Sequence, residues 1–80
     1  MAPNPYAVIG PRAAASLLLD AAARAVGAAV PDHARAGLEE LMETALEMAR
    51  DGLHQDARFV LGAALVVLTR RWAQPARHAA

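Results

Sequence analysis

Apolar residues recur at helical spacing most clearly in the middle of the chain. Six of them fall at i, i+3, i+4, i+7, i+10 and i+11, the spacing of one helix face: Leu38, Leu41, Met42, Ala45, Met48 and Ala49. The opposite side carries Glu39, Glu43 and Glu47 at i, i+4 and i+8, which is typical of a face in contact with water. This pattern predicts a helix over about residues 33–50.

Both ends of this helix carry boundary signals. Asp32 is predicted as its N-cap, because a short carboxylate can accept hydrogen bonds from the free amides of the first turn. Gly52 follows the helix, and glycine takes the left-handed backbone conformation at a helix C-terminus without steric cost. We expect a short turn there, leading into another helix.

The chain before Asp32 predicts an extended arm followed by a helix. The arm, residues 1–11, holds three of the five prolines, and Pro11 suits the start of a helix because its missing N–H would have no partner there. The helix is expected over about residues 12–29. It ends before Pro31, since the residue preceding a proline disfavours helical backbone angles.

Residues 55–72 predict a third helix that is apolar on two sides. One face holds Ala57, Val60, Leu61, Ala64, Leu65, Leu68 and Trp72. A second face holds Phe59, Ala63, Val66 and Val67. A helix that is apolar all round is expected to be buried all round, yet two other helices can cover only part of it. The apolar surface that stays uncovered predicts self-association or a protein partner, because contiguous exposed apolar patches are uncommon on monomers.

Length and composition favour a single all-α domain. Of the 80 residues, 56% are apolar but only 4% are aromatic, whereas strands favour β-branched and aromatic residues. A chain of this length forms one domain, here residues 12–73, with a flexible tail at residues 74–80. We predict a small three-helix arrangement in which the 33–50 and 55–72 helices form an antiparallel helical hairpin and the 12–29 helix packs across it.

Charge is unevenly placed although the formal net charge is zero. Residues 32–56 hold seven acids and two arginines, whereas residues 57–80 hold four arginines and no acid. Complementary segments of this kind steer an antiparallel partner into register. The predicted electrostatic contacts are Glu39, Glu43, Glu47, Arg70 and Arg71.

Catalytic and metal-binding motifs are missing from the sequence. The chain has no cysteine, and no two of its three histidines have the i, i+4 spacing of a helical metal site. The glutamates of the 33–50 helix lie opposite its apolar face, and no histidine follows them at the spacing that a di-metal bundle needs. A Gly-rich phosphate loop is also missing. We therefore expect a non-enzymatic protein without metal or cofactor.

Two segments bear on the cellular location. Residues 1–6 lack a basic stretch followed by an apolar run, so no signal peptide is predicted. The longest apolar run, Phe59 to Leu68, has ten residues and as a helix would span about half of a bilayer. We expect a cytoplasmic protein with no membrane span.

Small and bulky residues over residues 41–65 follow the spacing of a known helical hairpin. Seven positions have the spacing of its pattern. Leu41, Ala45 and Met48 stand where the pattern has Trp, Gly and Tyr, so neither aromatic residue of its first helix is present. Gly52 falls at its turn, and Ala57, Leu61 and Ala64 fall in its second helix. The segment resembles a tetratricopeptide repeat, although Thr44 and Thr69 replace the usual Leu and the closing Pro. The resemblance implies a function among peptide-binding adaptors and chaperones.

The sequence as a whole predicts a non-catalytic protein-binding module, either a homo-oligomer or a small adaptor or chaperone-like subunit. The predicted interface lies in the third helix and consists of Phe59, Leu61, Leu65, Val66, Val67 and Leu68. A nucleic-acid-associated regulator using Arg70, Arg71 and Arg77 is a second hypothesis, because arginine pairs with phosphate. A third is an accessory subunit of a larger enzyme assembly, which contributes stability rather than chemistry.

Overall fold

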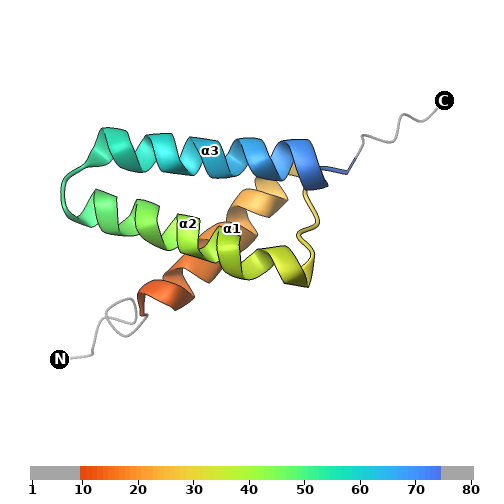
Figure 1. Cartoon of the computed structure of the whole chain (residues 1–80), viewed down its shortest axis with the longest axis horizontal. Coiled ribbons are helices and arrows are strands. Elements are labelled where there is room, and N and C mark those ends of the chain that lie inside the picture. The colour runs from red at the N-terminus through yellow and green to blue at the C-terminus, as the bar shows by residue number, and fades with distance from the viewer. Residues whose placement is uncertain (1–9, 75–80) are drawn as a thin grey trace.

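The computed structural model describes residues 10–74, which form three helices (Figure 1). These are α1 (Pro11–Val26), α2 (Asp32–Arg50) and α3 (His54–Trp72). Helices α2 and α3 lie antiparallel beside each other, and α1 crosses behind α2 in the view of Figure 1, with its C-terminal end next to α3. The predicted all-α arrangement with an antiparallel hairpin is confirmed. The predicted arm and tail, and Arg77 with them, fall mostly outside the described residues.

Helix α1 ends at Val26, three residues before the predicted end at Ala29. Gly27 takes a left-handed conformation with φ of 67°, and the N–H of Ala28 donates to the carbonyl of Ala23 at 2.8 Å. Because this pattern closes a helix by satisfying its last carbonyls, the proline at position 31 is not what stops α1. The residues after Gly27 therefore form a link rather than a last helical turn.

The predicted N-cap of α2 is wrong, because Pro31 occupies the N-cap position and Asp32 is the first helical residue. Pro31 has an extended backbone, with φ of −71° and ψ of 152°, which is the conformation that a cap requires. Asp32 still contributes a negative charge to the first turn, where the helix dipole favours it. At the other end Gly52 has φ of 83°, so the predicted left-handed glycine after α2 is confirmed.

The core lies where the three helices meet, and each helix supplies one of its largest fully buried side chains. These are Leu19 from α1, Met42 from α2 and Leu68 from α3. Small buried residues surround them, including Ala15, Ala22 and Ala64. Alanine at these positions lets the helix axes approach closely, so a core with few aromatic residues can still be well filled.

The link after α1 is tied to the end of α3 by backbone hydrogen bonds. The N–H of Ala29 donates to the carbonyl of Trp72 at 3.1 Å, and the N–H of Gln74 donates to the carbonyl of Gly27 at 2.8 Å. Between them Ala28 and Ala73 form an isolated antiparallel bridge. This short ladder fixes the end of the bundle opposite the α2–α3 turn (Figure 1).

Candidate protein-binding surface

The outer side of α3 carries an exposed apolar stripe. We call Phe59, Gly62, Ala63 and Val66 the α3 stripe; they follow one another at i, i+3, i+4 and i+7 and so share one face of the helix. The Phe59 residue is 78% exposed and Val66 is 51% exposed. On the inner side of α3, Ala57, Ala64 and Leu68 are buried, so the stripe points away from the core.

The structure divides the six predicted interface residues between two sides of α3. Phe59 and Val66 lie in the α3 stripe. Leu61, Leu65 and Val67 are partly buried and pack against the core. Leu68 is fully buried within the single chain, so it offers no surface to a partner. Residues two apart on a helix point about 200° away from each other, which is why Val66 and Leu68 face opposite ways.

Two of the three predicted acidic contacts are engaged within the chain. The side chains of Glu39 and Glu43 are only 16% and 26% exposed. Glu43 Oε2 lies 3.3 Å from Nε of Arg12 in α1, and it accepts no hydrogen bond among the described residues, so their contact is ionic. The sequence pattern predicts that this side of α2 is open to water. It is instead flanked by α1, and of the three predicted acidic contacts Glu47 is the one that stays exposed.

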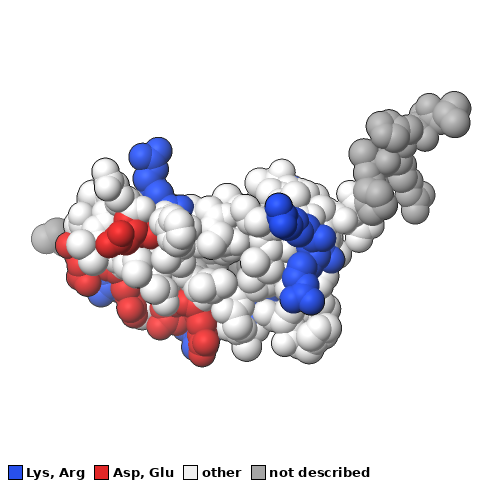
Figure 2. Space-filling model, turned by 45° about the horizontal axis from the view of Figure 1, so that its top comes forward, with Lys and Arg blue, Asp and Glu red and all other residues white. Residues whose placement is uncertain are grey.

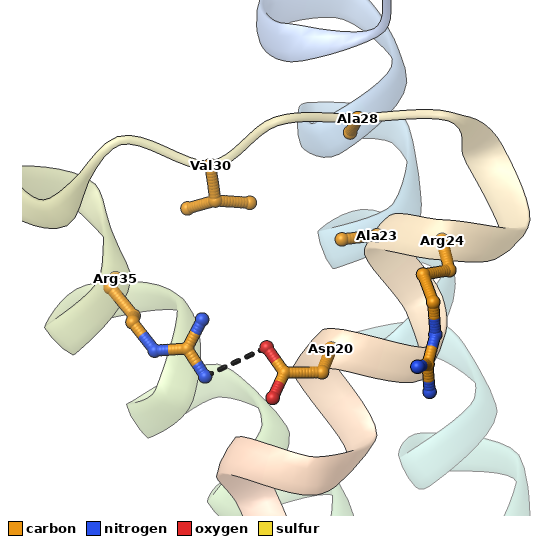
Figure 3. A pocket seen from close by; sticks show the side chains of 6 residues that line it. All are labelled: Asp20, Ala23, Arg24, Ala28, Val30 and Arg35. Carbon is orange, nitrogen blue, oxygen red and sulfur yellow. Dashed lines mark ion pairs between the residues drawn. The ribbon is translucent and has the colours of Figure 1, made fainter.

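Arg35 joins α1 to α2 at the edge of a surface hollow of about 350 Å³. Its Nη2 lies 2.8 Å from Asp20 Oδ1 and donates to Ser16 Oγ at 2.8 Å, and its Nε is 3.9 Å from Glu39 Oε1. Figure 3 shows the Asp20 carboxylate turned toward Arg35, with Arg24 on the other side of Asp20. Because Arg35 already has two carboxylates near it, we assign it a structural part in holding α1 against α2.

A second hollow, about 380 Å³ in volume, lies where all three helices meet near the α2–α3 turn. Its wall is mainly apolar and consists of Leu18, Ala45, Leu46, Ala49, His54, Ala57, Arg58 and Leu61. Three of these residues are alanines at the joint between α2 and α3, which leaves space that larger side chains would fill. No local pattern in the sequence predicts this hollow, because only the crossing of α1 over the hairpin forms its third wall.

Arginines gather at the C-terminal end of α3. Arg70 and Arg71 are exposed in its last turn, where the helix dipole favours positive charge. The guanidinium carbon of Arg71 lies 5.7 Å from the centre of the Trp72 ring, within the range of a cation–π contact. Figure 2 shows a cluster of basic side chains toward one end of this face, acidic side chains together with further basic ones toward the other, and mainly uncharged residues between them.

Three further findings bear on function. Within residues 10–74, no group of three His, Asp or Glu side chains is placed to hold a metal ion. None of the helices in the described part of the chain is long and apolar enough to cross a membrane. No protein-family model, curated protein or solved structure matches the chain. The resemblance of residues 41–65 to a tetratricopeptide repeat therefore stays a prediction.

Proposed function

We propose that this protein is a non-catalytic protein-binding module, a small helical adaptor or chaperone-like subunit of the cytoplasm. The α3 stripe is its contact surface. The observation that carries the proposal is the exposure of Phe59, because a phenylalanine side chain is stabilised by about 1.5–3 kcal/mol when it is removed from water. A partner helix laid along α3 would cover Phe59 and Val66 together.

The α3 stripe is preorganised for binding, because the helix that carries it is held in place within the single chain. The inner face of α3 is anchored by Leu68 and Ala64, which are fully buried, and its C-terminal end is held by the bond between Ala29 and Trp72. A surface fixed in this way loses little conformational entropy when a partner binds. The charges at the two ends of α3 favour one orientation of that partner over the other.

Photo-crosslinking tests the proposal. A photoreactive phenylalanine analogue placed at position 59 is expected to form a covalent adduct with one discrete protein, which is either a second copy or a different chain. The same analogue at position 47, an exposed site on α2, is the matched control and is expected to form none. Failure of position 59 to give any protein adduct would overturn the proposal.

Arg70 and Arg71 support nucleic-acid binding as a second candidate function, because both are exposed and adjacent at one end of the molecule. Such a binder would lose affinity for a single-stranded oligonucleotide steeply as salt rises, and again when both arginines become alanine. The zero net charge and the stacking of Arg71 on Trp72 favour the protein-binding function. A role as an accessory subunit would use the same α3 stripe and would give a heterologous adduct from position 59.

A further inference from the structure

We propose that the occupant of the α3 stripe is a second copy of this chain, packed antiparallel about a two-fold axis between Gly62 and Ala63. This inference rests on the proposed function, which requires only that the stripe binds a protein. The arguments for a second copy are the spacing of large and small residues along the stripe and the opposite charges of Asp56 and Arg70 near its two ends.

Gly62 lies at the centre of the stripe, in the interior of α3. A Cβ atom at this position would have nothing within 4 Å of it among the described residues. Positive φ angles within residues 10–74 are confined to Gly27 and Gly52, so the backbone at Gly62 does not require glycine either. Glycine in a helix interior is about 0.5–1 kcal/mol less stable than alanine. Gly62 and Ala63 together leave a flat point where a second helix can approach closely.

The positions around this point pair with one another in a single antiparallel register. When Gly62 of one copy lies opposite Ala63 of the other, Phe59 lies opposite Val66, and Gln55 lies opposite Arg70. Small residues then meet at the crossing point, and the larger ones meet one turn away on both sides. Crossing helices diverge from their point of closest approach, so the larger side chains fill the space that opens there.

Charge selects the antiparallel orientation. Asp56 lies in the first turn of α3 with the exposed Arg58 after it, and Arg70 and Arg71 lie in the last turn. A two-fold antiparallel pair brings Asp56 of each copy toward Arg70 of the other, twice in one interface, whereas a parallel pair would place Arg70 and Arg71 of the two copies side by side. Figure 2 shows a cluster of basic side chains at one end of this face, with the acidic side chains, and a further basic one, toward the other end.

The expected dimer is weak, because the stripe is narrow. A phenylalanine buries roughly 150–250 Å², whereas a stable interface of standard size covers about 800 Å² on each partner. We therefore expect association that depends on protein concentration in the micromolar range, as found for interfaces below the standard size.

Disulfide crosslinking tests the register, because the chain has no cysteine of its own. Ala63→Cys is expected to form a covalent dimer under mild oxidation, since the two copies of position 63 lie beside the axis. Gln55→Cys is expected not to link to itself, because its own copy is displaced by 15 residues, about 22 Å along the helix, and disulfides join Cα atoms less than about 7 Å apart. A mixture of Gln55→Cys with Arg70→Cys is expected to link.

Light scattering tests the contact point. Gly62→Leu is expected to weaken dimerisation at least tenfold while leaving the chain folded, because leucine favours a helix over glycine. Gly37 in α2 has the same open surroundings but does not lie in the stripe. The control variant Gly37→Leu adds the same bulk elsewhere, and it is expected to leave dimerisation unchanged.

The outcomes separate this inference from the proposed function. Self-linking of Gln55→Cys, or a dimer unaffected by Gly62→Leu, would overturn the antiparallel pair. A chain that stays monomeric at all concentrations, while position 59 crosslinks to a different protein, would overturn the second copy and leave the protein-binding function intact. A monomer with no adduct from position 59 would overturn both.

Discussion

Helices α2 and α3 have the same length, 19 residues each, and lie antiparallel in one hairpin, yet their outer sides differ. The outer side of α2 carries Glu40, Thr44 and Glu47, all exposed. The outer side of α3 carries Phe59 and Val66, also exposed. Thr44 donates to the carbonyl of Glu40 at 2.9 Å, so even its hydroxyl has a partner within the helix.

The two helices therefore pack in the same way on their inner sides and differ in the polarity of their outer sides. The inner faces are alike, since α2 buries Leu38, Met42 and Ala45, and α3 buries Leu68 with two alanines. Folding of the single chain therefore does not require the apolar stripe on α3. The polar side chains on the outer side of α2 are hydrated, whereas Phe59 and Val66 leave water only when another molecule covers them, and this burial stabilises the complex.

The largest effect is expected inside the hairpin, from Leu68→Ala. Leu68 is fully buried, and replacing such a leucine by alanine destabilises a protein by about 2–5 kcal/mol through lost burial and the cavity left behind. Urea denaturation followed by circular dichroism measures this loss. Val66→Ala, on the opposite side of the same helix, is the control, and at dilute concentration it is expected to change stability by less than about 0.5 kcal/mol. Equal losses of unfolding free energy for both variants would show that the two sides of α3 do not differ in burial.

An intermediate effect is expected from glycine substitutions, with opposite signs at two positions. A methyl group added at Gly52 or at Gly62 would have no atom within 4 Å of it among the described residues. The two substitutions therefore do not differ in steric clash. Gly52 has φ of 83°, and Gly52→Ala is expected to destabilise the chain by about 1–2 kcal/mol. Gly62→Ala is expected to stabilise the dilute monomer by about 0.5–1 kcal/mol. Thermal unfolding at low concentration tests both, and a loss of stability at Gly62 would contradict the account of α3.

The smallest effect is expected on the outer side of α2. Glu47 is exposed, so Glu47→Gln is expected to change the unfolding free energy by less than about 0.5 kcal/mol. Light scattering is expected to give the same mass for this variant as for the unmodified chain. A change in mass would show that the outer side of α2 takes part in binding, and the contrast between the two helices would then fail.

Local signals in the sequence were enough to predict the hairpin. The periodicity around Leu38 and Met42 predicted α2, and Gly52 predicted the turn, because both depend on residues close together in the chain. The end of α1 was predicted too late, because the prediction rested on Pro31, whereas Gly27 closes the helix. Asp32 was predicted as a cap, but the extended backbone of Pro31 takes that position instead.

The sequence by itself determined that α3 has more apolar surface than two neighbouring helices can cover, because periodicity places each residue on a face of its own helix. Only the tertiary structure decided which face is covered. The crossing of α1 buries Leu68 and leaves Phe59 exposed, and it brings Arg12 to Glu43 on a side of α2 that the sequence alone assigned to water. Contacts between helices depend on how their axes cross, and periodicity within one helix carries no record of that crossing.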